Sequence, residues 1–518
     1  MTWQDEVDEI ERRKQMAFRM GGEERVAFHH AQGKLTARER IDLLSDAGSF
    51  REFMVLSGSG TYVDGELAEF IPKPAVTGFS LIEGRKAVIS AGDFTVRGGS
   101  GGGGGGILGQ ELGATRRALE WRLPYIRLLD AAGGSVRHFE EIGRTYLPDG
   151  NNMVVTDVAL LRSVPVVAAV LGSVAGLPAV DVCLSHFSVM VKDTSQVFPG
   201  GPPVVKAALG VDISKEDLGG YRVHTRLSGV VDNLAETESE ALAITRRFLG
   251  YLPSNVWSMP PRLECADPPD RRDESLLSII PRDRRRPYSA HKILEAVLDE
   301  GSFFEIAPGY GRARITGFGR LNGYPVGVMA NNPLYLGGAT DVAAGAKTIR
   351  LIQLCDTFHL PLISFADEPG VMVGPESERQ GIERAGAQLM MAVCDSSMPW
   401  LTVVTGQLFG VAGACHHRPT GMFQRYVWPS ASWGSMHIEG GTTAAYRREI
   451  ESANDKEAKR LEIEARLKAI GSPFRTAEQT GQDIIDPRET RELLCEFVED
   501  AQPILRSQLG QTGMPYRP

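Results

Sequence analysis

Two short glycine-rich loops carry the residue types best suited to chemistry in this sequence. The first covers residues 172–177 (GSVAGL), the second covers residues 409–414 (FGVAGA), and each follows an apolar run. A strand that turns through small residues into a helix leaves backbone N–H groups pointing outward at the helix N-terminus, where they can stabilise a developing oxyanion. The same glycines can equally serve only to let the chain turn tightly. Both interpretations stay open for each loop.

No side-chain catalyst stands out beside these loops. The sequence lacks the GxSxG pattern of a nucleophile elbow and the HExxH pattern of a zinc protease. His416 and His417 adjoin the second loop, but no spaced carboxylate or third ligand accompanies them, so we expect no metal. Asp130 and Asp367 close two apolar runs, a place typical of both catalysis and turn capping. The nearly continuous glycine run 98–106 lacks a dinucleotide-binding setting and is predicted to be a flexible loop.

An internal duplication pairs the two loops. Six landmarks recur in the same order in both halves, and the offset between the copies drifts only from 239 to 234 residues. The pairs are Gly84 with Gly323, Gly98 with Gly337, Pro124 with Pro361, Asp130 with Asp367, Pro165 with Pro399, and Gly172 with Gly406. An ordered set of this kind indicates two copies of one fold, so the two glycine loops occupy equivalent places.

Short apolar runs alternate with helical patterns in each copy. The runs 124–130 (PYIRLLD) and 361–367 (PLISFAD) are bounded by proline and aspartate, which predicts buried strands. Thr36 and Glu39 have the spacing of a capping box for a helix that begins at Ala37. We expect further helices at residues 346–358, 382–393 and 449–468. The alternation predicts the α/β class.

Length and composition set the domain count and exclude several classes of function. The 518 residues exceed one ordinary core, and residues 253–287 are rich in Pro and Arg, as linkers are. We therefore expect domains at residues 1–255 and 291–518, with a linker at 256–290. A net charge of −9 argues against a nucleic-acid partner, and no apolar run is long enough for a membrane span. The polar N-terminus is unlike a signal peptide, and six cysteines without a CxxC pair indicate reduced thiols in the cytoplasm.

Longer segments add a family resemblance. The segments GGEERVAFHHAQGKLTARERIDLL, DLGGYRVHTRLSGVVDN, FADEPGVMVGPESERQGIERAGAQL and SPFRTAEQTGQDIIDPRETRELL follow one another over almost the whole chain. In this order they resemble the carboxyltransferase (beta) subunits of biotin-dependent acyl-CoA carboxylases, in particular propionyl-CoA carboxylase beta chains. The resemblance implies two tandem crotonase-like domains of the ClpP/crotonase ββα spiral type. It also implies a homo-oligomer, usually a hexamer, with each active site shared between subunits.

The resemblance implies a reaction as well, namely carboxyl transfer from carboxybiotin to the α-carbon of an acyl-CoA. The enolate would be held by two backbone oxyanion holes. Position by position, Gly176 and Leu177 would face the thioester oxygen, while Val411 and Ala412 would face the biotin oxygen. The substrate-binding residues would be Gly133, Gly134 and Ala175, and the biotin-binding residues would be Phe409, Gly410 and Gly413.

Three departures place the chain in a divergent subgroup of this family. Leu177 stands where the best-known branch has a second glycine, residues 101–106 are polyglycine where charged residues are usual, and the turn DAAGGSVRHFEE is one residue longer. The chain has neither a GxxxxGK[ST] ATP-binding motif nor an AMKM-type biotin attachment site. We therefore expect separate biotin carboxylase and biotin carboxyl carrier subunits as partners, with biotin held on the carrier.

Three other functions compete with this interpretation. A biotin-dependent acyl-CoA decarboxylase subunit would run the transfer in reverse on the same residues. A non-catalytic assembly subunit would keep the fold and lose the activity. A crotonase-type hydratase or hydrolase would need a pair of carboxylates aimed at the acyl chain, and the sequence offers no such pair.

Overall fold

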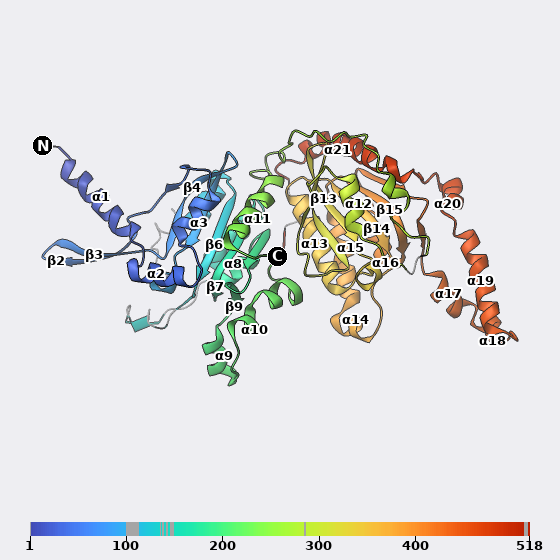
Figure 1. Ribbon diagram of the computed structural model, residues 1–518, viewed down its shortest axis with the longest axis horizontal. Helices are drawn as coiled ribbons and strands as arrows, with labels where there is room; N and C mark the ends of the chain where they lie inside the picture. The colour runs from blue at the N-terminus through green and yellow to red at the C-terminus, as the bar shows by residue number, and fades with distance from the viewer. Residues whose placement is uncertain are drawn as a thin grey trace. The chain divides into compact units, whose positions relative to one another are not determined.

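The fold of the chain is given by a computed structural model (Figure 1). The structure describes residues 2–99, 113–134, 136, 139–140, 143–145, 150–283, 286–511 and 516–517. The predicted flexible loop falls largely outside them, since they include Gly98 and Gly99 but not the polyglycine run 101–106. The chain divides into two compact units, Met1–Ser258 and Met259–Arg517. Each unit is built around one mixed β-sheet with helices, which confirms the predicted α/β class.

The first unit holds a sheet in the order β1-β4-β5-β6-β7-β8-β10, with β9 also paired to β7. Its strands are β1 (Arg51–Glu52), β4 (Ala75–Ile82), β5 (Arg85–Gly92), β6 (Tyr125–Ala131), β7 (Val166–Ala175), β8 (Phe187–Val191), β9 (Gln196–Phe198) and β10 (Asn233–Ala235). The pairs β1–β4 and β4–β5 are antiparallel, and the later pairs are parallel. The predicted strand 124–130 is confirmed as β6. A separate hairpin joins β2 (Gly58–Val63) to β3 (Glu66–Pro72).

Helices cover this sheet and extend beyond it. They are α1 (Gln4–Phe18), α2 (Glu23–Ala31), α3 (Ala37–Leu44), α5 (Ala114–Trp121), α7 (Gly150–Leu160), α8 (Leu177–Cys183), α9 (Pro202–Leu209), α10 (Lys215–Gly219) and α11 (Glu238–Tyr251). Helices α3 and α11 pack against each other and against the sheet. The capping box is confirmed at the start of α3, where Thr36 and Glu39 bond each other's backbone N–H groups. This cap fixes the N-terminus of a helix whose inner face is buried.

The second unit repeats the topology, in the order β11-β12-β13-β14-β15-β16 with β17 also paired to β15. Its strands are β11 (Phe304–Glu305), β12 (Arg314–Leu321), β13 (Tyr324–Asn331), β14 (Leu362–Glu368), β15 (Trp400–Phe409), β16 (Phe423–Val427) and β17 (Ser432–Gly434). Antiparallel pairs at one edge again give way to parallel pairs. The predicted strand 361–367 is confirmed as β14. The matching order supports the duplication that the landmarks indicated.

The helices of the second unit are α12 (Ala290–Val297), α13 (Val342–Thr357), α14 (Pro375–Gln380), α15 (Ile382–Asp395), α16 (Gly410–Ala414), α17 (Ile438–Ala445), α18 (Arg447–Glu451), α19 (Lys456–Ile470), α20 (Pro473–Thr480) and α21 (Thr490–Ser507). The helix predicted at 382–393 is confirmed. The one predicted at 346–358 begins earlier, because Asp341 caps it. The single helix predicted at 449–468 is wrong: Asp455 caps a new helix, α19, so α18 and α19 are separate.

The second sheet is buried on both faces. Val326 and Val328 of β13 join α12 and α21 in one core cluster. Gly327, between them, faces α13, where an added Cβ would lie 2.2 Å from Cys355 Sγ. Successive residues of a strand point to opposite faces, so these contacts place helices on both sides of the sheet. Two-sided burial explains why its strands read as continuous apolar runs rather than alternating patterns.

Equivalent glycines explain one landmark of the duplication. A β-carbon added at Gly172 would lie 2.1 Å from Asp130 Oδ1, and one added at Gly406 would lie 2.2 Å from Asp367 Oδ1. Each aspartate lies where the pairing of its strand with the next one shifts register. No side chain fits at either glycine while the aspartate keeps its position, so aspartate and glycine recur together in the two units.

Residues 256–290, where the composition predicts a linker, contact the second unit. The Arg271 guanidinium donates to the carbonyl oxygen of Ala296 at 2.9 Å. Leu276 is buried in the core cluster that α12 and α21 form. The segment is therefore packed from Met259 onward as part of the second compact unit.

Candidate active site

The first glycine loop forms a strand-to-helix junction. Strand β7 ends at Ala175, Gly176 takes a positive φ of 70°, and α8 begins at Leu177. A positive φ is costly for residues that carry a β-carbon, so glycine suits this turn. Gly133 also has a positive φ of 79°, and a β-carbon on it would lie 2.5 Å from the carbonyl oxygen of Ala175. The structure thus brings four of the predicted acyl-side residues together at one end of β7, namely Gly133, Ala175, Gly176 and Leu177.

The backbone amides of this junction are not equivalent. The Gly176 N–H donates to the carbonyl oxygen of Phe198 in β9 at 3.3 Å. Pro178, the next residue but one, has no N–H. Within the described part of the chain, no acceptor is bonded to the Leu177 N–H. Of the predicted pair, it is therefore the Leu177 N–H that has no acceptor in the described part of the chain. Gly134 is exposed, and an added β-carbon there would meet no atom within 4 Å.

The second glycine loop forms the equivalent junction in the other unit. Strand β15 ends at Phe409, and α16 begins at Gly410, which takes a positive φ of 60°. Among the residues that the structure describes, none accepts a hydrogen bond from the N–H of Val411 or of Ala412. Ala412 stands at the place that Pro178 occupies in the first junction, so the adjacent N–H groups of Val411 and Ala412 both remain as donors at the start of α16. This arrangement can bind one oxygen that carries negative charge.

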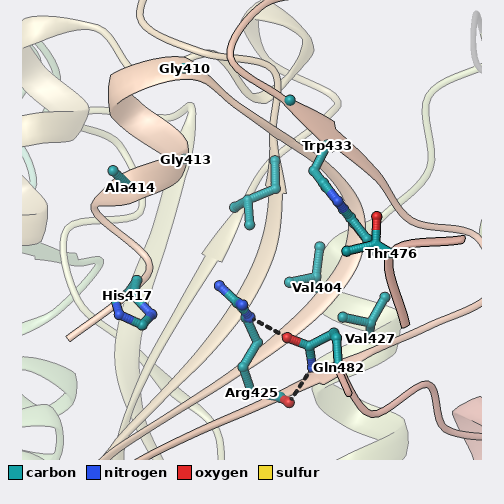
Figure 2. Close-up of a pocket in the computed structure, with 12 residues that line it drawn as sticks. Val404, Gly410, Gly413, Ala414, His417, Arg425, Val427, Trp433, Thr476 and Gln482 are labelled. Carbon is teal, nitrogen blue, oxygen red and sulfur yellow. Dashed lines mark hydrogen bonds between the residues drawn. The ribbon is translucent and has the colours of Figure 1, made fainter. Parts of the chain in front are cut away.

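The predicted biotin-binding residues serve two different purposes. The Phe409 ring is buried against His437, with the ring centroids 4.1 Å apart, so its side chain has a packing role. Gly410 and Gly413 instead line a pocket of about 420 Å³ beside α16 (Figure 2). Val411 is exposed, and its side chain borders a separate, much smaller hollow. Of the three predicted biotin-binding residues, the two glycines therefore line the larger pocket and Phe409 does not.

Asp130 and Asp367, the two strand-end aspartates, are engaged in the interior. Asp130 is fully buried and lies 3.2 Å from the Arg40 guanidinium and 3.3 Å from Lys34 Nζ. Asp367 accepts from the Tyr288 hydroxyl at 2.8 Å and from a backbone N–H at 2.6 Å. These contacts favour a structural role for both aspartates, close to the turn-capping interpretation, over a catalytic one.

A buried ion pair supports the second junction from behind. Glu368, at the end of β14, lies 2.7 Å from the Arg314 guanidinium, and both side chains are almost fully buried. Thr340 and Asn331 also donate to the same carboxylate oxygen, at 2.6 and 2.9 Å. Burial alone would raise the pKa of Glu368, but the Arg314 charge, the neighbouring His416 and the Thr340 hydrogen bond lower it to about 2.

His416 belongs to this buried cluster. Its Nδ1 lies 2.7 Å from Ser364 Oγ and its Nε2 lies 3.1 Å from Arg314 Nη1. Burial, followed by the Arg314 charge, lowers the pKa of His416, so the neutral ring is favoured. The part of the chain that the structure describes holds no group of three His, Cys, Asp or Glu side chains able to bind a metal ion. It also contains no helix long and apolar enough to cross a bilayer.

The Glu368 pair makes the fold acid-sensitive. Because the pKa of the folded state lies below the ordinary value of 4.5, ionised Glu368 stabilises the fold above that pH. We predict a loss of about 3 kcal/mol as the pH falls from 4.5 toward 2. Denaturant midpoints across this range would measure the loss, and the Glu368→Gln variant should lack this part of the acid limb. An identical acid limb in both proteins would contradict the assignment.

Comparison with known proteins identifies the family of this site. The family model described as the carboxyl transferase domain matches residues 28–502. The chain belongs to the carboxyl transferase domain family. It is 36% identical to the propionyl-CoA carboxylase carboxyltransferase subunit of Haloferax mediterranei, covering 95% of each chain. It is 33% identical to the methylmalonyl-CoA decarboxylase subunit alpha of Veillonella parvula, covering 91% of each.

A solved structure gives the same result for the fold. The hexameric transcarboxylase 12S, with methylmalonyl-coenzyme A bound, aligns with a TM-score of 0.87 and 30% identity, over 96% of this chain and 95% of that one. The resemblance to propionyl-CoA carboxylase beta chains is therefore confirmed, and so is the crotonase-like fold of a carboxyltransferase. The protein is an enzyme of carboxyl transfer to acyl-CoA in a biotin-dependent family. This result sets aside the non-catalytic and hydratase alternatives.

Several residues at the site escaped prediction from sequence. Arg425 of β16, Trp433 and Gln482 line the pocket beside α16 (Figure 2). A charged residue inside the strand FQRYV was the available signal for Arg425. Gln482 lies 57 positions further along the chain, so no local pattern could have linked it to Arg425.

Proposed function

We propose that this chain transfers a carboxyl group from carboxybiotin to the α-carbon of an acyl-CoA, using two backbone oxyanion holes. The observation that supports this most strongly is the pair of equivalent junctions, each with a positive-φ glycine and an amide that has no acceptor in the described chain. Leu177 would serve the thioester oxygen with Gly176 beside it. Val411 and Ala412 would serve the biotin oxygen. Preorganised amides of this kind need no reorganisation as charge develops.

The second junction fits the ureido group of biotin. Two adjacent amides without acceptors suit a single oxygen, and the neighbouring pocket offers apolar walls from Val404, Leu408 and Trp433. Bound biotin would supply the carboxyl group and a nitrogen able to take the substrate α-proton. The chain itself contributes positioning and charge stabilisation, which explains why no side-chain base is needed.

We assign the acyl-CoA side to residues 1–255 and the carboxybiotin side to residues 291–518. Gly133, Gly134 and Ala175 would contact the acyl-CoA, and the close approach of Gly133 to Ala175 supports a shared surface there. Phe409, Gly410 and Gly413 would border the biotin side. The proposed partners are a biotin carboxylase and a biotin carboxyl carrier subunit, because the sequence lacks an ATP-binding motif and a biotin attachment site. A cytoplasmic location would suit the six free cysteines.

The reaction can be tested by reconstitution. The purified chain would be combined with a biotin carboxylase, a biotinylated carrier, ATP and labelled bicarbonate, across straight, branched, hydroxylated and aromatic acyl-CoAs. We expect label in an acyl-CoA product only when all three proteins are present. ATP-dependent carboxylation by the chain alone would contradict the proposal, as would failure of every acyl-CoA with a carrier shown to be carboxylated.

Decarboxylation remains a second candidate because one of the relatives has that function. The chain is 33% identical both to the methylmalonyl-CoA decarboxylase subunit of Veillonella parvula and to the propionyl-CoA carboxylase beta chain of Homo sapiens. The same two holes serve either direction of transfer. The direction would be decided by whether the complex with its natural partner chains takes up bicarbonate with ATP or releases CO2 from a carboxylated acyl-CoA.

The first prediction from this proposal concerns assembly. A site shared between the first domain of one subunit and the second domain of another cannot form in a monomer. We expect light scattering to give a mass about six times the 56.3 kDa of one chain, as in the 12S hexamer. An active monomer would contradict the shared site.

The second prediction concerns the side chain at the first junction. Leu177→Gly keeps the backbone N–H and removes a half-buried side chain. We expect turnover to persist while the preference among acyl-CoAs changes by roughly 10- to 100-fold in the ratio of kcat/KM values. Leu177→Met, which keeps the volume, is the matched control and should leave the preference nearly unchanged. An unchanged preference in Leu177→Gly would place the acyl group elsewhere.

A further inference from the structure

The pocket beside α16 has a composition unlike that of an ordinary surface hollow. It has a volume of about 420 Å³ and is lined by residues of α16, β15, β16 and β17, by His417 after α16, and by the segment around α20 (Figure 2). Its lining residues are Val404, Leu408, Gly410, Gly413, Ala414, His417, Arg425, Val427, Trp433, Gly434, Thr476 and Gln482. Arg425 is the one permanently charged residue among these, and the set includes no aspartate or glutamate.

Arg425 is held in place by an amide and not by a carboxylate. Its Nε donates to Gln482 Oε1 at 2.7 Å, and Gln482 Nε2 donates back to the Arg425 carbonyl at 2.8 Å. Figure 2 shows these two bonds and the guanidinium projecting from β16 between His417 and Gln482. Over the ranges that the structure describes, no carboxylate is ion-paired with this guanidinium, and its Nη atoms make no hydrogen bond. The two Nη atoms of the Arg425 guanidinium are therefore available to a ligand in the pocket.

Two other arginines of the same unit, both almost fully buried, are neutralised by carboxylates. Arg314 is paired with Glu368 at 2.7 Å and Arg491 with Asp299 at 2.9 Å. Arg425 is half-buried without such a partner, and burial lowers its pKa. The Arg425 charge in turn adds to burial in lowering the pKa of His417, so the pocket wall carries one uncompensated positive charge. A desolvated cation in an apolar wall favours an anionic ligand.

We propose that this pocket binds a ligand with a carboxylate, to which the Nη atoms of Arg425 donate hydrogen bonds. The apolar body of the ligand would contact Val404, Leu408 and Trp433. The planar fork of arginine matches the two oxygens of a carboxylate. A phosphate would normally require further donors, and the described residues that line the pocket include no second Lys or Arg. Two ligands could supply this carboxylate: an acyl-CoA whose acyl chain ends in a carboxylate, or carboxybiotin through its carboxyl group. Both candidates rest on the proposed function.

Calorimetry on the assembled oligomer tests the acyl source. Glutaryl-CoA ends in a carboxylate, whereas valeryl-CoA has the same chain length and ends in a methyl group. If the acyl chain is the source, Arg425→Gln should weaken binding of glutaryl-CoA by roughly 10- to 100-fold and leave valeryl-CoA unchanged. Because binding is measured directly, this arm gives a result even if carboxyl transfer, and with it the proposed function, should fail.

Transfer kinetics with a carboxylated carrier test the other source. If carboxybiotin supplies the carboxylate, Arg425→Gln should raise KM for the carrier by roughly 10-fold or more and leave both CoA affinities unchanged. Arg425→Lys keeps the positive charge and should bind the carboxylate ligand with an affinity between those of Arg425→Gln and the unsubstituted enzyme. It also allows the test to be made if Arg425→Gln does not fold. Arg475→Gln makes the same chemical change on the exposed surface of α20 and should have no effect. If neither ligand responds to the loss of Arg425, the proposal is overturned.

Discussion

Replacing Val411 with proline should reduce the rate of carboxyl transfer by about 100-fold or more while acyl-CoA binding stays close to normal. The substitution removes one of the two adjacent N–H groups that have no acceptor in the described chain. Loss of one donor from an oxyanion hole costs on the order of 3 kcal/mol in other enzymes. The acyl-CoA affinity should persist because Leu177, the proposed donor to the thioester, belongs to the other compact unit.

The fold should tolerate this change, so the rate can be interpreted. Proline is accepted in the first turn of a helix, and Val411 is the second residue of α16. Val411→Ala keeps the N–H and trims an exposed side chain, so it should transfer carboxyl groups at nearly the rate of the unsubstituted enzyme. Circular dichroism and light scattering would first establish that both variants fold and assemble. A folded Val411→Pro enzyme with full activity would rule out a backbone hole at this junction.

Replacing Arg314 with methionine should destabilise the second unit by about 3–5 kcal/mol. The change leaves the Glu368 charge buried, with hydrogen bonds from Asn331 and Thr340 but no cation beside it. Breaking one partner of a buried pair is costly because the remaining charge cannot return to water. Denaturant midpoints of the assembled oligomer would measure the loss.

Two comparisons separate the ion pair from a general packing defect. Arg312→Met changes an exposed arginine two positions away and should shift stability by less than about 0.5 kcal/mol. Arg314→Met combined with Glu368→Gln should cost less than the sum of the single changes, because neither charge is then left alone. Additive single effects would mean that the two side chains do not interact.

Much of the fold followed from local sequence patterns. Strands β6 and β14 are apolar runs bounded by proline and aspartate, and the capping box at Thr36 fixed the start of α3. The ordered recurrence of six landmarks, with Gly172 and Gly406 among them, predicted two equivalent units. In the structure the reason is steric, since each glycine makes room for an aspartate on the neighbouring strand.

The parts of the site that sequence did not predict depend on contacts between distant segments. The sequence predicted that the Gly176 N–H would be one donor of the first oxyanion hole. In the structure this N–H donates to the carbonyl oxygen of Phe198 in β9, a contact that no local pattern could predict. The pocket cation was missed because Arg425 acquires its setting from Gln482, far along the chain. Sequence alone left a catalytic role open for Asp130 and Asp367. In the structure Arg40 is ion-paired with Asp130 and the Tyr288 hydroxyl donates to Asp367, and both partners come from other elements of the chain.

The most direct test of the account is a single-turnover transfer without ATP. A carrier whose biotin bears a labelled carboxyl group would be mixed with the purified oligomer and an acyl-CoA that supports turnover in reconstitution. We predict that label appears in the acyl-CoA product, and that Val411→Pro slows its appearance by about 100-fold while Val411→Ala does not. Label that stays on the carrier or leaves only as CO2, with every acyl-CoA unlabelled, would contradict carboxyl transfer by this chain.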